Sequence, residues 1–134
     1  RPENLFDHLV SNKESWFNIA GLTIRKSAIE RVGYFDEALT IAEDTDIIWR
    51  LAQSSIIVSG EADSPIAVRW VHPGNSYQDV SSLNRGRYKF YKKWKNLLPG
   101  ITLSKQAKDR INDAYRYYHR RMLINSAFNW FNNK

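Results

Sequence analysis

Three carboxylates stand together in Glu43-Asp44-Thr45-Asp46, directly before an apolar run that begins at Ile47. The pattern predicts a helix that starts at these carboxylates and turns its apolar side inward. The positive end of the helix dipole favours anions there, so a carboxylate stays ionised and able to accept a proton. Asp is also a favoured helix N-cap, and the residues alone leave a capping role for Asp44 open.

Other side chains offer chemistry of a weaker kind. Trp16 and Trp49 have rings on which the apolar face of a sugar could stack, although either ring could equally be part of the core. Arg25 and Lys26 could contact phosphates or lie in solvent. His72 stands in the loop-forming stretch His72-Pro73-Gly74-Asn75-Ser76. A neutral imidazole can bind a metal ion, and it can also simply cap a turn.

The elements that would position these residues follow from periodicity and turn chemistry. Strands are expected at 16–24, 55–59 and 66–71, with Gly21 inside the first. Ser27 and Glu30 form a capping box for a short helix that Gly33 ends. Further helices are expected over 2–10, from about Asp44, over 77–97 and over 104–131.

The composition fits one ordinary globular domain. The chain has 134 residues, five Trp, six Phe and seven Tyr, and no Cys. It therefore has the aromatic residues for a core, but no disulfide or thiolate chemistry. No apolar run is long enough to span a membrane. The chain begins Arg1-Pro2-Glu3, without Met or a signal-peptide pattern, which we interpret as part of a longer protein.

An ordered set of short motifs runs from Gly21 to Leu51. It consists of Gly21, Arg25-Lys26, Val32-Gly33-Tyr34-Phe35-Asp36-Glu37, Glu43-Asp44-Thr45-Asp46 and Arg50-Leu51. This set resembles the acceptor-side, C-terminal part of family-2 nucleotide-sugar glycosyltransferases. The resemblance implies an α/β fold, with a small mixed sheet and C-terminal helices. It also implies two parts, an acceptor-side catalytic part over 1–77 and a helical, basic and aromatic extension over 78–134.

The resemblance further implies a function and a set of site residues. The enzyme would be a non-processive, inverting hexosyltransferase of polysaccharide biosynthesis, since Ile66 replaces the Gln that processive synthases carry before Arg69-Trp70. Asp44 would be the general base that takes the acceptor hydroxyl proton, with Glu43 as an orienting group. The donor and acceptor would be bound by Gly21, Arg25, Lys26, Asp36, Trp49, Asn75 and Ser76. His72 would contact a divalent metal, Mn²⁺ or Mg²⁺, held mostly outside this chain.

The charge is divided unevenly along the chain. Residues 1–84 carry 7 Lys/Arg and 12 Asp/Glu, whereas residues 85–134 carry 13 Lys/Arg and 2 Asp/Glu. Aromatic residues alternate with the basic ones, so the second part could bind an anionic membrane surface. It could also bind nucleic acid, although it carries none of the known nucleic-acid-binding motifs. It could also be a solvated helix face. We expect a cytoplasmic protein, peripheral on the inner face of the membrane if the first interpretation holds.

Overall fold

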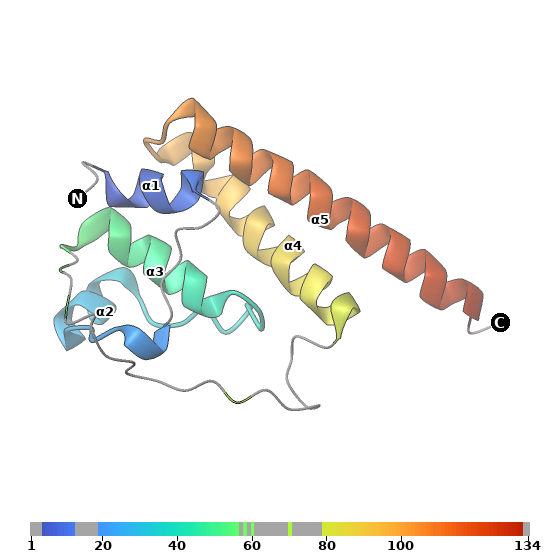
Figure 1. The fold of residues 1–134 in the computed structure, drawn as a ribbon, viewed down its shortest axis with the longest axis horizontal. Coiled ribbons are helices and arrows are strands. Elements are labelled where there is room, and N and C mark those ends of the chain that lie inside the picture. Colours follow the sequence, from blue (N-terminus) through green and yellow to red (C-terminus); the bar gives the residue numbers. More distant parts are fainter. Residues whose placement is uncertain are drawn as a thin grey trace.

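The computed structural model describes residues 4–12, 19–56, 58, 60, 70 and 79–132. Every regular element in these ranges is helical (Figure 1). The α-helices are α1 (Leu5–Ser11), α2 (Lys26–Val32), α3 (Glu43–Ser54), α4 (Val80–Leu97) and α5 (Lys105–Asn132), and the 3₁₀ turns are η1 (Ile19–Gly21) and η3 (Leu98–Gly100).

The predicted α/β fold is therefore wrong for the described part of the chain. Gly21 lies in the 3₁₀ turn η1 instead of a strand. Ser55, Ile56, Val58 and Trp70 are not in strands either, and the other residues of 55–59 and 66–71 lie outside the described ranges. The prediction relied on short apolar runs, whose periodicity does not distinguish a strand from other buried segments. Because the glycosyltransferase family is built around a sheet, this helical arrangement also overturns the identification of the chain as a member.

The helices themselves begin and end largely where local chemistry predicts. Asn4 caps α1 by accepting from Asp7 N at 2.9 Å, and Asp79 caps α4 through the amides of Ser81 and Ser82. These bonds satisfy amides that have no partner within a helix. The capping-box prediction is wrong, because α2 already begins at Lys26 and has no side-chain cap.

Gly33 ends α2 as predicted, with a positive φ of 81° that favours glycine. A second glycine allows close packing. A methyl group at Gly86 of α4 would lie 2.5 Å from Ile41 Cγ1, so only glycine lets the helix approach the loop before α3 this closely.

The core is an aromatic cluster shared by α1, α3 and α4. Phe6, Trp49, Phe90 and Trp94 are all buried, with the Trp49 and Trp94 ring centroids 5.1 Å apart at 72°. Edge-to-face contacts of this kind add to the stabilisation from burial. Leu103, Ala107 and Ile111 extend the same cluster to α5. The core thus draws residues from both 1–77 and 78–134.

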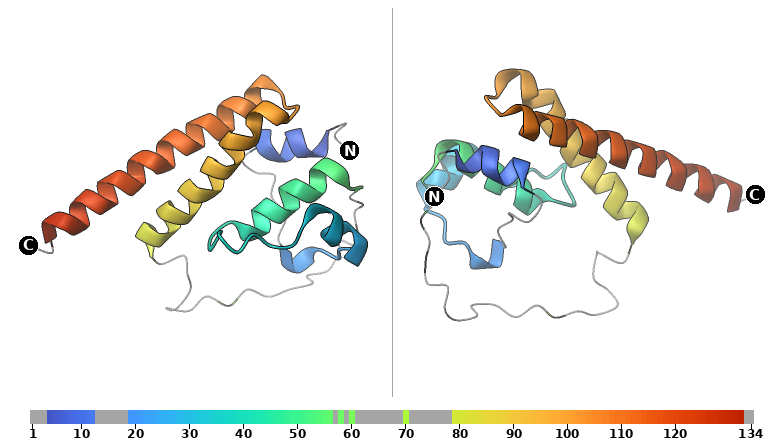
Figure 2. Two further views of the ribbon diagram at one scale, coloured as in Figure 1. Left: turned by 180° about the vertical axis from the view of Figure 1, so that it is seen from behind. Right: turned by 45° about the horizontal axis from the view of Figure 1, so that its top comes forward.

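Helices α4 and α5 form an antiparallel pair of unequal length. At 1.5 Å per residue, the 28 residues of α5 span about 42 Å and the 18 of α4 about 27 Å. The last turns of α5 consequently project past the start of α4, as the views from the front and from behind both show (Figures 1 and 2).

Candidate functional site: a groove beside Asp44

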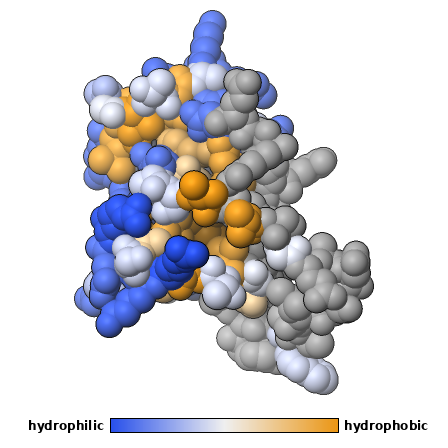
Figure 3. Space-filling model, turned by 90° about the vertical axis from the view of Figure 1, so that its left-hand side faces the viewer, coloured by the Kyte–Doolittle hydropathy of each residue, from blue (hydrophilic) through white to orange (hydrophobic). Residues whose placement is uncertain are grey.

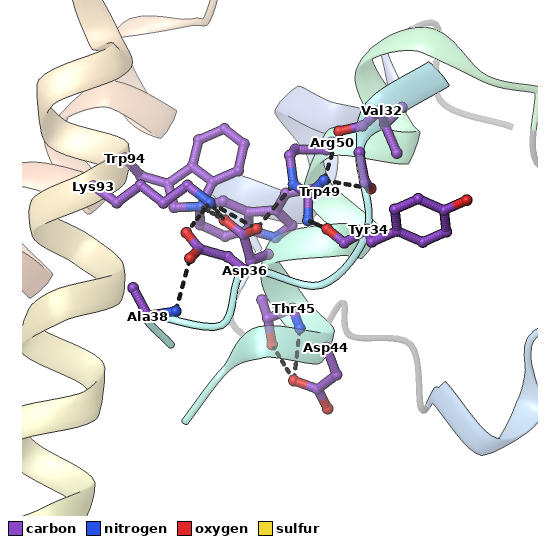
Figure 4. Close-up of polar contacts among 12 residues, drawn as sticks. Val32, Tyr34, Asp36, Ala38, Asp44, Thr45, Trp49, Arg50, Lys93 and Trp94 are labelled. Carbon is purple, nitrogen blue, oxygen red and sulfur yellow. Dashed lines mark hydrogen bonds and ion pairs between the residues drawn. The ribbon is translucent and has the colours of Figure 1, made fainter. Parts of the chain in front are cut away.

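Asp44 lies in the first turn of α3 but does not cap that helix. The N-cap is Ala42, whose φ of 64° places it in the left-handed region that non-glycine residues rarely adopt. Asp44 Oδ1 accepts from Thr45 N at 2.6 Å and from Thr45 Oγ1 at 3.2 Å. Its Oδ2 has no hydrogen-bond partner among the described residues, and the carboxylate turns away from the polar contacts of Asp36, Arg50 and Lys93 (Figure 4). One oxygen is thus held in place and the other is available.

An open groove of about 1150 Å³ lies beside this carboxylate. Ile41, Ala42, Asp44 and Thr45 form its α3 side, and Ser11 of α1 contributes to its wall. Helices α4 and α5 supply the rest of the lining, which combines cations, carboxylates, an amide and aromatic rings: Arg87, Phe90, Tyr91, Lys105, Gln106, Asp109, Arg110, Asp113, Ala114, Tyr117 and Tyr118.

The aromatic wall of the groove is held by contacts between α4 and α5. The rings of Tyr91 and Tyr118 stack with their centroids 5.5 Å apart and their planes at 8°. Arg87 Nη1 donates a hydrogen bond to Tyr118 Oη at 2.9 Å. Burial, followed by the proximity of Tyr118, raises the pKa of Tyr91, so its phenol stays protonated near neutral pH. Arg110, also in the lining, has a buried Nη1 without a hydrogen-bond partner. The groove therefore offers fixed rings and an unsatisfied donor nearby.

The second carboxylate of the motif, Asp46, has a different environment. Its side chain is completely buried and accepts from Arg50 Nε at 2.9 Å, from Lys93 Nζ at 2.9 Å and from Trp94 Nε1 at 3.0 Å. Lys93 also donates to Asp36 Oδ2 at 2.8 Å (Figure 4). These bonds connect α3, α4 and the loop before α3, so Asp36 and Asp46 form a polar centre that joins the elements of the fold.

Arg50 extends this centre to the end of α2. It donates through Nη1 to the carbonyls of Val32 at 2.6 Å and Gly33 at 2.8 Å, and through Nη2 to that of Tyr34 at 2.8 Å. The guanidinium thereby fixes the turn that leads into the loop carrying Asp36. Sequence analysis assigned Arg50 no such role, and no local signal shows that its partners lie 16 to 18 residues earlier.

The remaining predicted site residues are not gathered at the groove. Glu43 is half-buried in the first turn of α3 and is not part of the groove lining. Gly21, at the end of η1, is exposed, as are Arg25 and Lys26 at the start of α2. Lys26 Nζ lies 3.8 Å from Glu30 Oε1. Trp49 is only 8% exposed and packs in the core, so in this arrangement it presents no free ring to a sugar. His72, Asn75 and Ser76 lie outside the described residues.

Two further findings bear on ligands and membranes. Within residues 4–12, 19–56 and 79–132 and the three single described positions, no group of three or more His, Asp or Glu side chains is placed to hold a metal ion. No helix of this described portion has the length and apolar character needed to cross a bilayer.

Together, the fold and the groove define the described chain as a helical protein with an aromatic core and a mixed polar and aromatic groove. Comparison with protein-family models, characterised proteins and solved structures gave no match.

Proposed function

We propose that the groove binds a sugar-containing acceptor, and that Asp44 takes the proton from an acceptor hydroxyl when a sugar is transferred to it. The observation that carries the proposal is the available Oδ2 of Asp44 beside the groove, on a carboxylate whose other oxygen is fixed by Thr45. A base must be both positioned and unpaired to accept a proton.

The groove lining suits a carbohydrate better than a purely apolar ligand. The exposed ring of Tyr117, beside the stacked pair of Tyr91 and Tyr118, offers a surface on which the apolar face of a pyranose can pack. Gln106 and Arg110 can donate hydrogen bonds to sugar hydroxyls, while Asp109 and Asp113 can accept them. The volume of about 1150 Å³ accommodates more than one sugar ring.

In the proposed step, the acceptor oxygen forms a bond to the anomeric carbon of the donor sugar. The bond from that carbon to the diphosphate of a nucleotide-sugar donor breaks, and the leaving diphosphate keeps the electron pair. Asp44 accepts the hydroxyl proton as the new bond forms, because an un-ionised hydroxyl is a poor nucleophile. We assign only the acceptor side of this reaction to the groove.

Acceptor binding is tested first, by saturation-transfer NMR with a panel of oligosaccharides. Tyr117→Ala removes an exposed ring from the groove and is expected to weaken binding about tenfold. Tyr34→Ala is the matched control, since Tyr34 is 63% exposed and lies outside the groove. No binding by the wild-type chain, or equal losses in both variants, would refute the assignment of the groove.

The chemical role is tested separately, by sugar transfer in the complete protein. Asp44→Asn is expected to lower the transfer rate about a hundred-fold to ten-thousand-fold while acceptor binding stays nearly unchanged. Glu37→Gln, at an exposed loop position, is the control and should retain activity. Transfer by Asp44→Asn at a rate near that of the wild type contradicts the role of Asp44 as the base.

A further inference from the structure

The projecting part of α5 carries an apolar line on its exposed side. Ile124 and Phe128, one turn apart, are 60% and 66% exposed, and Tyr117 lies two turns before Ile124. Residues spaced by four and by seven positions share one face of an α-helix. The line therefore continues over about three turns of α5, and Leu123 and Trp130 are exposed on another side of the same helix.

Arginines border this line on both sides. Arg120 and Arg121 lie between Tyr117 and Ile124 in the chain, and both are exposed, with Arg121 Nε donating to Tyr117 Oη at 3.2 Å. The spacing of three and four residues places them on opposite edges of the apolar line. From position 114 to the end of the chain there is no Asp or Glu, so these charges have no acidic neighbour further along the helix.

This combination is typical of a helix that lies in the plane of a membrane interface. The apolar side chains enter the boundary between headgroups and acyl chains, while flanking arginines reach anionic headgroups. Apolar surface is also exposed elsewhere, at Ile56 and Val58 near the end of α3. Figure 3 views the opposite side of the molecule from the projecting end of α5, and apolar residues are exposed next to hydrophilic ones there too.

Other occupants fit the chemistry of this face less well. If two copies paired through it about a twofold axis, four arginines would come to one interface, and residues 114–134 offer no Asp or Glu to pair with them. Nucleic acid would neutralise the arginines and could stack a base on Phe128, but it would leave Ile124 without an apolar contact. An anionic bilayer satisfies both kinds of side chain at once.

We propose that the exposed face of α5 around Ile124 and Phe128 docks on anionic membrane surfaces, with Arg120 and Arg121 contacting lipid headgroups. The helix lies along the interface and does not cross it. Tyr117 belongs to both the groove and this line, but Ile124, Phe128, Arg120 and Arg121 are not part of the groove lining, so variants at these four positions test the inference independently of the role proposed for Asp44.

The test is flotation of the chain with vesicles of phosphatidylcholine alone or with about one-third phosphatidylserine, at low and high salt. Binding is expected only with phosphatidylserine and should fall steeply as salt is added. Arg120→Gln/Arg121→Gln should weaken binding about 30-fold, at about tenfold per 1.4 kcal/mol and about 1 kcal/mol for each basic residue. Lys26→Gln/Lys89→Gln removes two exposed charges outside α5 and should have a much smaller effect.

The apolar part has its own pair of variants. Ile124→Ser/Phe128→Ser is expected to weaken binding about tenfold or more, because both side chains leave water when the helix docks. Ile56→Ser/Val58→Ser, at positions 82% and 76% exposed, is the matched control and should bind like the wild type. Circular dichroism checks that each variant keeps its helical content.

Three outcomes would overturn the proposal. One is equal binding to neutral and anionic vesicles. Another is loss of binding in the control variants to the same extent as in the α5 variants. The third is no vesicle binding at all, together with concentration-dependent dimerisation or nucleic-acid binding that the α5 variants abolish, which would assign this face to a second copy or to nucleic acid.

Discussion

Replacing Asp46 with alanine tests whether the buried polar centre holds the helices together. Asp46 is fully buried, and its carboxylate accepts from Arg50, Lys93 and Trp94. Asp46→Ala removes the carboxylate that accepts all three of these hydrogen bonds. Breaking a buried ion pair from one side typically costs about 3–5 kcal/mol, because an uncompensated charge remains.

The structure places the expected cost near the lower end of that range. Lys93 keeps its bond to Asp36, and Arg50 keeps its bonds to the carbonyls of Val32, Gly33 and Tyr34. The indole N–H of Trp94 has no such substitute, and an orphaned buried donor costs about 1–3 kcal/mol. We therefore expect Asp46→Ala to lower the free energy of unfolding by about 3 kcal/mol.

The assay is urea unfolding followed by tryptophan fluorescence, since Trp49 and Trp94 lie in the core. Asp36→Ala is the comparison, because it removes a partly exposed partner of the same lysine and should cost only about 0.5–1 kcal/mol. A loss below about 1 kcal/mol for Asp46→Ala, or equal losses for the two variants, would refute the reasoning that burial sets the difference.

Three further changes test neighbouring features. The hydrogen bond from Lys93 holds the pKa of Asp36 below its ordinary value of 3.8. The ionised Asp36 therefore stabilises the fold above pH 3.8, and this stabilisation is lost as the pH falls through the lower folded-state pKa. Asp36→Asn should remove this part of the pH dependence, so the acid unfolding curve should become flatter below pH 3.8. Gly86→Ala should destabilise by about 1–3 kcal/mol in the same urea assay, because the new methyl group meets Ile41, whereas no effect would mean that the loop moves freely. Tyr118→Phe should cost about 1 kcal/mol by removing the bond it accepts from α4, and an unchanged urea midpoint would show that this bond contributes nothing.

Local signals predicted the helices well and the fold class poorly. The helix boundaries depend on interactions within a few residues, which can be read from the sequence directly. Examples are the acidic start of α3 at Glu43, the glycine that ends α2 at Gly33, and the periodicity of α4 and α5. The strand predictions needed a pairing partner, which the sequence does not specify. Gly21 in particular fits a 3₁₀ turn as readily as a strand.

The candidate site was predictable only in part. Asp44 could be singled out because it belongs to a short motif, but the α4 and α5 residues that complete the groove are distant in the chain. The burial of Asp46 was not predicted either, since Lys93 and Trp94 lie 47 and 48 residues further on. From sequence alone, Asp44 and Asp46 both appear as first-turn acids, and only tertiary packing separates their roles.

The unequal lengths of α4 and α5 have a consequence for backbone exchange. Around Ile111, the α5 backbone is packed in the core, so its amide hydrogens should exchange with deuterium only when the whole protein unfolds. Beyond Leu123, the helix depends mainly on its own hydrogen bonds, and an unsupported end of this length frays readily in water. Exchange should therefore accelerate by orders of magnitude along a single continuous helix, and contact with a surface that orders its end should slow it again.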